Sequence, residues 1–557
     1  MIEIVDVLTD RATYHPAERA TIQTALGNDS RRVFRGLLRA RLLSLDRELA
    51  RAEEPLELAP HAQEKHSLAL TLPTADRRGY GVEIELVDVR GRVIAHKATA
   101  LDVSSNWALA PRYGFLSDFA SDEDDSAERL AALARYHINA VQFYDWMYRH
   151  HEFLPPTREF IDPLGRPLSL ETVRRKIQLA QQFGMKALAY AAIYAMSPDF
   201  FAEHREQGLY RSDGEPCMLG DFLNITNIAH PAWRERLFAQ CRRAVDEAGF
   251  DGIHLDQYGY PRIGYAADGT RVDVEKELPA FLSAVRAAVN GAPTVFNAVN
   301  AWPLDAVAQS SVEPLYIEVW RPNDTFRDLR EMILGARGLR GGRAPVLAAY
   351  LRDFLSTDST ARRGAFHALR RLTAAIYLNG GSHIALGERG GVLCDPYFPK
   401  YARLRPAQAQ TMRADYDFIA RYAEYLFDPA WRDLSATRVG GINEEIRLDA
   451  PRYGPHADAN SIWTIVRGKE NVLTLGLINL RGLGTTAWNV PQPAPRRIRN
   501  LRVMLQLERP LKAAYFASPD HSEGRAVPLP IQRAGRLAYI TLPELNYWGL
   551  VILSLQP

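Results

Sequence analysis

The chain has 557 residues, 47% of them hydrophobic and 24% charged, with a formal net charge of +2. This length predicts about two to four domains, and the near-neutral charge argues against a nucleic-acid-binding protein, which would carry a basic face. There is no run of about eighteen apolar residues, so no membrane-spanning segment is expected, and three widely spaced cysteines predict neither a disulfide framework nor a zinc site.

Residues 1–107 have the pattern of β-structure. Apolar and polar residues alternate at 67–72 and 81–87, and turn-forming residues follow each stretch, which predicts a small immunoglobulin-like β-sandwich. The stretch 33–52 has helical propensity, but its alternation of Leu and Arg also fits strands, and both interpretations remain open. No cluster of catalytic side chains occurs here, so we expect a supporting domain.

Residues 108–429 alternate between strand and helix patterns. Eight such units over about three hundred residues predict a TIM (β/α)8 barrel. A doubly wound open sheet is the alternative, but it would require a glycine-rich phosphate turn after the first strand, and 113–118 supplies none. The expected strands are 113–118, 140–146, 186–194, 252–256, 295–300, 315–320, 346–350 and 382–386, and the expected helices include 125–137, 169–183, 231–248, 274–289, 326–338 and 362–379.

Residues 430–557 return to a β pattern. Prolines at 491, 493 and 495 separate two groups of alternating stretches, and we expect a C-terminal antiparallel β-sandwich. The expected strands are 461–466, 471–480, 501–505, 514–517, 537–542 and 550–555.

Asp256 and Glu318 are acids at the ends of two predicted strands. A carboxylate among apolar strand residues is costly unless it is paired, solvated or used in chemistry, and for either acid alone a structural rim carboxylate is the alternative. Only the strand 295–300 lies between their strands, so the acids come from alternate strands, which supply the same layer of a closed barrel. This arrangement favours a catalytic pair.

Aromatic and polar side chains gather at the predicted strand ends. Sugar rings present apolar C–H faces and rims of hydroxyls, so a sugar site needs aromatic platforms flanked by amide, carboxylate and imidazole groups. Ordinary core packing is the alternative for each aromatic residue. The candidate substrate-binding residues are Tyr144, Asp145, Trp146, Tyr194, Gln257, Asn297, Asn300, Trp320, Tyr350 and His383.

No metal site or cofactor is expected. His150 and His151 are adjacent, so their side chains point apart, and no further His or Cys follows at ligand spacing. The sequence also lacks a Gly-x-Ser-x-Gly elbow and a phosphate-binding loop of the Walker type.

Six motifs in order along the chain resemble those of glycoside hydrolase family 66, which contains dextranases and cycloisomaltooligosaccharide glucanotransferases. They are Tyr-Gly-Phe-Leu-Ser-Asp at 113–118, Gln-Phe-Tyr-Asp-Trp at 142–146, Gly-Phe-Asp-Gly-Ile-His-Leu-Asp at 249–256, Phe-Asn-Ala-Val-Asn at 296–300, Tyr-Ile-Glu-Val-Trp at 316–320 and Gly-Gly-Ser-His at 380–383. The resemblance covers the whole predicted barrel. It implies a retaining mechanism on α-1,6-linked glucan, with Asp256 as nucleophile and Glu318 as acid/base.

The predicted barrel departs from the cyclising members of the family, because no long carbohydrate-binding module interrupts it. This favours hydrolysis of dextran or isomalto-oligosaccharides over cyclisation by a glucanotransferase, and a glucan-binding barrel without activity is the remaining alternative. After Asp256, the donors of Gln257 and Tyr258 are expected to favour the charged carboxylate. No nucleic-acid or membrane partner is expected, and the oligomeric state is open. The N-terminus has no signal-peptide pattern, so a cytoplasmic location is expected for the chain as written, and secretion if the N-terminus is truncated.

Overall fold

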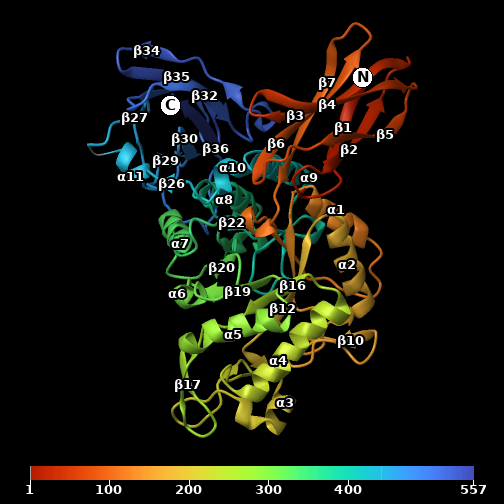
Figure 1. Ribbon diagram of the computed structural model, residues 1–557, viewed down its shortest axis with the longest axis vertical. Coiled ribbons are helices and arrows are strands. Elements are labelled where there is room, and N and C mark those ends of the chain that lie inside the picture. The colour runs from red at the N-terminus through yellow and green to blue at the C-terminus, as the bar shows by residue number, and fades with distance from the viewer. Residues whose placement is uncertain (1, 441, 557) are drawn as a thin grey trace.

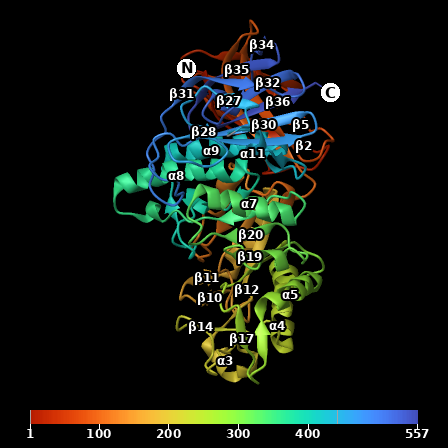
Figure 2. The same ribbon diagram turned by 90° about the vertical axis from the view of Figure 1, so that its left-hand side faces the viewer.

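The structure, a computed structural model of the protein, describes residues 2–440 and 442–556. It is an elongated mixed α/β molecule. The N-terminal and C-terminal β-sheets lie at one end, and helices α3 (Pro198–Glu203), α4 (Pro231–Arg243) and α5 (Val274–Ala288) lie at the other (Figures 1 and 2). A curled sheet of parallel strands occupies the middle. No helix in the described residues is both long and apolar enough to cross a membrane.

The first part of the chain forms two antiparallel sheets around one shared core. The region 33–52 forms paired strands in place of a helix, because alternation buries Leu38 and Leu42 while Arg39 and Arg41 reach Glu85 from the other face. One sheet contains β1 (Ile2–Thr9), β2 (Arg19–Asn28) and β5 (Gln63–Thr71), and the other contains β4 (Arg47–Leu58), β3 (Phe34–Ser44), β6 (Arg78–Asp88) and β7 (Val93–Val103).

The central sheet contains each of the eight predicted strands. Neighbouring strands pair in parallel, and the segment 382–387 pairs at its start with one end of the row and at its end with the other, so the sheet curls round on itself. In chain order the strands are β8 (Tyr113–Leu116), β9 (Ala140–Phe143), β12 (Lys186–Ala192), β16 (Gly252–Asp256), β19 (Thr294–Val299), β20 (Leu315–Glu318), β21 (Val346–Ala348), β22 (Ser382–His383) and β23 (Leu386–Gly387), followed by the short antiparallel strands β24 (Gly391–Val392) and β25 (Ala402–Arg403).

Helices connect most of the parallel strands, close to their predicted positions. After α4, a π-helical turn ends at Gly249, whose φ of 96° lies in the left-handed region that favours glycine. The chain then enters β16, which carries Asp256 at its end. The other connecting helices are α1 (Ser126–Ala134), α2 (Leu170–Gln182), α6 (Leu304–Val307), α7 (Phe326–Leu339) and α8 (Ser359–Leu378).

Small hairpins extend from the strand ends and had no clear signal in the sequence, because each strand is only two or three residues long. They are β10 (Glu159–Ile161) with β11 (Pro167–Ser169), β13 (Ala195–Met196) with β15 (Leu223–Ile225) and β14 (Met218–Leu219), and β17 (Ile263–Tyr265) with β18 (Arg271–Asp273).

Helices α9 (Pro406–Arg421) and α10 (Ala423–Phe427) join the central region to the N-terminal sheets. Arg421 contacts Glu83 of β6 at 2.6 Å, and both side chains are buried. The backbone of Gly79 donates to the Glu424 carboxylate at 2.8 Å. A Cβ at Gly79 would lie 2.2 Å from the carbonyl oxygen of Ala420, so this approach requires glycine.

The last part of the chain also forms two sheets around a shared core. One sheet contains β26 (Arg432–Asp433), β28 (Tyr453–Gly454), β29 (Ile462–Lys469), β30 (Val472–Asn479), β36 (Trp548–Leu555), β32 (Leu511–Ala517) and β33 (Val527–Pro528), and the other contains β27 (Ile446–Leu448), β31 (Ile498–Leu505), β35 (Leu537–Leu545) and β34 (Gln532–Ala534), with the short helix α11 (Ser435–Arg438) nearby.

Candidate active site

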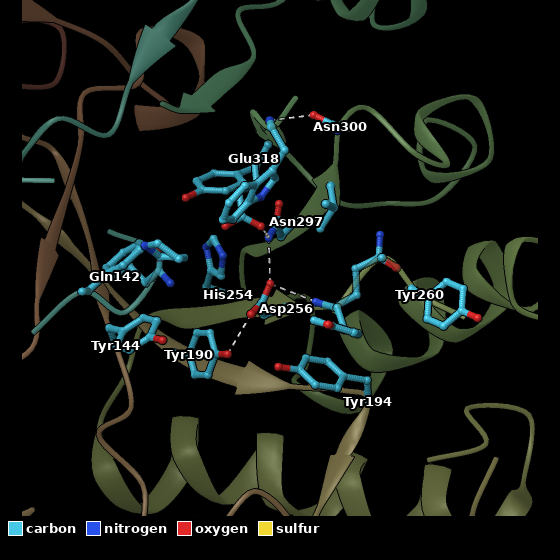
Figure 3. Close-up of a pocket in the computed structure, with 18 of the residues that line it drawn as sticks. Gln142, Tyr144, Tyr190, Tyr194, His254, Asp256, Tyr260, Asn297, Asn300 and Glu318 are labelled. Atoms are coloured by element: carbon cyan, nitrogen blue, oxygen red, sulfur yellow. Dashed lines mark hydrogen bonds between the residues drawn. The ribbon is translucent and has the colours of Figure 1, made fainter. Parts of the chain in front are cut away.

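A cavity of about 540 Å³ opens at the carboxyl ends of the central strands. Figure 3 shows the side chains that surround Asp256, among them Tyr190 and Asn297, each joined to it by a hydrogen bond. The cavity is lined by Gln142, Tyr144, Tyr190, Tyr194, His254, Asp256, Gln257, Tyr258, Gly259, Tyr260, Arg262, Asn297, Val299, Asn300, Tyr316, Glu318, Trp320, Tyr350, Pro396 and Phe398.

Asp256 is the last residue of β16, and three donors hold its carboxylate. One oxygen accepts a 2.7 Å hydrogen bond from the hydroxyl of Tyr190 on the adjacent strand β12. The other oxygen accepts from the amide nitrogen of Asn297 at 2.8 Å and from the backbone N–H of Gln257 at 2.9 Å. The carboxylate is therefore fixed in orientation from three sides.

Glu318 is the last residue of β20, and it receives two hydrogen bonds. Tyr350, which follows β21, donates its hydroxyl to one carboxylate oxygen at 2.5 Å. Asn297 donates to the other oxygen at 3.0 Å. The same amide nitrogen of Asn297 thus contacts both acids.

The shared donor limits how far apart the two acids can lie. One oxygen of Asp256 and one of Glu318 are no farther apart than the sum of the two Asn297 hydrogen-bond lengths. That sum is below the ~6.5–9.5 Å that separates the carboxyl groups of inverting glycosidases. A spacing of this size is nearer the ~5–5.5 Å that separates the carboxyl groups of retaining glycosidases.

The charge state of Asp256 reflects two opposing effects. Burial, together with the nearby Glu318 carboxylate, raises the pKa of Asp256 to about 7. The hydrogen bonds from Asn297, Tyr190 and Gln257 lower this pKa, as expected for donors to a charged group. The sequence predicts donors at Gln257 and Tyr258. The backbone N–H of Gln257 is one of the donors to Asp256. The other two hydrogen bonds to this carboxylate come from Tyr190 and Asn297.

The family model for glycosyl hydrolase family 66 matches residues 9–552, nearly the whole chain. The chain belongs to glycosyl hydrolase family 66. The resemblance in its motifs is thereby confirmed, and with it the prediction that the protein is an enzyme of this class.

Curated members of family 66 are distant relatives of this chain. A cycloisomaltooligosaccharide glucanotransferase from Niallia circulans is 24% identical, and the alignment covers 98% of this chain and 71% of that protein. A dextranase from Streptococcus salivarius is 21% identical over 86% of this chain and 67% of that one.

Among solved structures, the crystal structure of a Paenibacillus cycloisomaltooligosaccharide glucanotransferase, complexed with cycloisomaltoheptaose, has the same fold. The TM-score is 0.91 at 23% identity, and the match covers 99% of this chain and all of that one.

Seven of the ten residues predicted to bind substrate line the cavity of this family-66 chain. The side chain of Asn300 is hydrogen-bonded within the protein. It accepts from the backbone N–H of Trp320 at 2.6 Å and donates to the carbonyl of Arg321 at 2.9 Å. The Gln257 amide likewise donates to a backbone carbonyl. The seven residues are Tyr144, Tyr194, Gln257, Asn297, Asn300, Trp320 and Tyr350.

Trp146 and His383 do not reach the cavity, so their prediction as sugar contacts requires correction. Trp146 is fully buried, packs against Phe250 and donates its indole N–H to the carbonyl of Tyr190. His383 is buried beneath the site and contacts the carbonyl of Ala349, and burial lowers the pKa of its imidazole to about 4. Both residues belong to the core.

Asp145 lies beside the cavity without lining it. The residue is buried and has a φ of 46°, and its backbone carbonyl accepts a hydrogen bond from Arg166. Burial raises the pKa of the Asp145 carboxyl to about 7, and the Asp256 charge adds to this effect. The two carboxylates therefore influence each other electrostatically.

Several lining residues were not among the ten candidate substrate-binding residues. Tyr190 and His254 precede the strand ends and project inward, where the hydroxyl of Tyr113 contacts His254 at 2.9 Å. Burial lowers the pKa of His254 to about 3, so the ring is neutral. Phe398 comes from the loop after the eighth strand and stacks on Tyr144 with ring centroids 4.4 Å apart. The inward alternation within β12 and β16 could have identified the first two.

No metal site is apparent in the part of the chain that the structure describes: no three His, Cys, Asp or Glu side chains there are grouped to hold an ion. His150 and His151 are both buried, and burial lowers the pKa of each ring to about 4.

Proposed function

We propose that this protein cleaves α-1,6-glucosidic linkages of dextran or isomalto-oligosaccharides with retention of configuration, with Asp256 as nucleophile and Glu318 as acid/base. The observation that carries the proposal is the amide of Asn297, which donates to both carboxylates and keeps them closer than in an inverting site. Membership of family 66 and the dextranase relative support the choice of substrate.

In the first step, a carboxylate oxygen of Asp256 attacks the anomeric carbon C1. The bond from C1 to O6 of the leaving sugar breaks, and the Glu318 carboxyl gives its proton to that O6. In the second step, a water molecule loses a proton to the Glu318 carboxylate and forms a bond to C1, while the bond from C1 to Asp256 breaks. Two inversions return the product to the α configuration.

The neighbouring side chains orient the two acids and the sugar. Tyr190 and Tyr350 each hold one acid by a hydroxyl donor. Tyr144, Tyr194 and Trp320 supply aromatic faces for the apolar side of a glucosyl ring. We assign Asn300 and Gln257 to positioning, because their side chains bond to backbone groups that shape the wall.

We also infer the finer architecture of the chain: a (β/α)8 barrel over residues 108–429 between β-sandwich domains at 1–107 and 430–557. The pairing of segment 382–387 with both β21 and β8 supports closure of the barrel. The paired sheets with a shared core at each end support the two sandwiches.

The proposal is tested by incubating the protein with dextran and with isomaltoheptaose. Products are separated by chromatography with mass detection, and the anomeric configuration of the first product is read by NMR. Linear isomalto-oligosaccharides released in the α form are expected. Cyclic products would instead identify a glucanotransferase, β-configured products would exclude retention, and binding without any product would identify a non-catalytic glucan-binding protein.

A further inference from the structure

A second cavity, of about 580 Å³, adjoins the candidate active site. Trp320 and Tyr350 line both cavities, so these two residues form the boundary between them. The second cavity is lined by Val319, Trp320, Arg321, Asp324, Tyr350, Arg352, Trp488 and Asn489. Its walls therefore come from the chain after β20, the chain after β21 and a loop of the C-terminal region.

The second cavity begins on the Glu318 side of the acid pair. Tyr350 contacts the Glu318 carboxylate through its hydroxyl, and Trp320 follows Glu318 by two residues. The rings of Trp320 and Tyr350 are 5.6 Å apart, and the guanidinium of Arg352 lies 5.7 Å from the Trp320 ring centroid. An aromatic face flanked by polar groups thus stands directly beside the acid.

The loop of the C-terminal region is fixed to the chain after β20. The side chain of Asn489 donates to the Asp324 carboxylate at 2.7 Å, and the indole N–H of Trp488 donates to the carbonyl of Asn323 at 2.9 Å. The backbone N–H of Trp488 also donates to the carbonyl of Asp324. These bonds hold the far wall of the cavity in a defined position.

We propose that this second cavity binds the glucosyl units on the leaving-group side of the cleaved bond. The inference rests on the proposed function, because the acid that protonates O6 must lie next to the sugar that departs. When that bond breaks, the proton from Glu318 passes to O6 of the sugar held between Trp320, Arg352 and Asn489. The ligand class is a neutral α-1,6-linked glucosyl chain, and the C-terminal region contributes directly to its binding site.

The test compares two substrates of the full-length protein. Isomaltoheptaose has sugars on both sides of the cleaved bond, whereas α-isomaltosyl fluoride has only fluoride as leaving group. In the Arg352→Ala and Asn489→Ala variants, the ratio of kcat/KM for isomaltoheptaose to that for the fluoride should fall about tenfold, the loss expected for one good contact. Arg327→Ala, which removes an exposed arginine of α7 outside both cavities, is the matched control and should keep the wild-type ratio.

An unchanged ratio in both Arg352→Ala and Asn489→Ala would overturn the inference. So would equal losses with the two substrates, because sugars on the other side of the bond, or general damage, affect both alike. Two variants from different parts of the chain are used because Asn489→Ala alone also removes a contact to Asp324. Failure of the proposed function is a different result, in which the wild-type protein turns over neither substrate.

Discussion

Asp256 and Glu318 accept hydrogen bonds from the same amide nitrogen, that of Asn297 on the strand between theirs. A single donor therefore bridges the two acids, and its hydrogen bond to Asp256 lowers the pKa of that carboxyl. The strand order, in which β19 separates β16 from β20, makes this possible, since a side chain from the middle strand reaches both neighbours.

Replacing Asn297 with Ala should lower kcat by roughly tenfold to hundredfold, because both acids lose a positioning donor. The hydrogen bond from Asn297 also lowers the pKa of Asp256, so its removal should move the acidic limb of the kcat/KM profile to higher pH. A pH–rate profile measures both effects. A fall in kcat with an unmoved acidic limb would contradict direct action on Asp256.

The roles of the two acids should be separable by azide. Glu318→Ala with azide should give a glycosyl azide of retained α configuration, because the intermediate on Asp256 still forms. Asp256→Ala with azide should give the β product, because azide then attacks in place of the carboxylate. Glu318→Gln should retain activity on an activated fluoride, whose departure needs no proton. The reverse pattern of azide products would exchange the two assignments.

Asp145→Ala should lower turnover by roughly a hundredfold, since the carboxylate beside the cavity is expected to bond to hydroxyls of the reacting sugar. Asp145→Asn is the matched variant, because Asn accepts the residue's left-handed backbone, with φ of 46°, more readily than Ala does. Steady-state kinetics should show a large loss in both. A loss confined to Asp145→Ala would assign the effect to the backbone, and wild-type kinetics in both would exclude a role in catalysis.

The stability of the protein should depend on pH through Asp256. Its pKa is raised from 3.8 to about 7 by burial and by Glu318, so the folded state holds this proton more tightly than the unfolded state does. This contribution to stability is complete below about pH 4 and is lost as pH rises through about 7. The Asp256→Asn variant carries no charge at this position, so its stability should not fall in this way as the pH rises.

At pH 8 the Asp256→Asn variant should therefore exceed the wild type by roughly 2–4 kcal/mol in free energy of unfolding. Thermal unfolding followed by circular dichroism from pH 4 to pH 8 measures the difference. It should shrink steadily toward pH 4. A difference that stays constant with pH would show that the Asp256 charge is not the cause.

The positions of the strands and of the two acids could be predicted from the sequence, because short apolar runs that end on a carboxylate mark a strand end directly. The direction of side chains beyond a strand end could not. After β9, the left-handed backbone at Asp145 breaks the alternation, and Trp146 turns into the core although Tyr144 faces the cavity. His383 lies at the start of the eighth strand, below the site.

Residues that reach the site from long loops also left no periodic signal. Phe398 stacks on Tyr144 from a loop far along the chain, and the contact of Trp488 with Asn323 joins regions 165 residues apart. Such contacts depend on how the separate units dock, and local propensity does not encode docking.

The junction between β6 and α9 has a consequence for engineering. Arg421 and Glu424 belong by sequence to the central region, yet their buried partners, Glu83 and the backbone of Gly79, belong to the N-terminal sheets. A cut at residue 107 would leave the side chains of Arg421 and Glu424 without these buried partners. Breaking a buried ion pair such as that of Arg421 costs about 3–5 kcal/mol. An exchange of the N-terminal sheets should therefore carry α9 and α10 with them, so that these buried partners stay together.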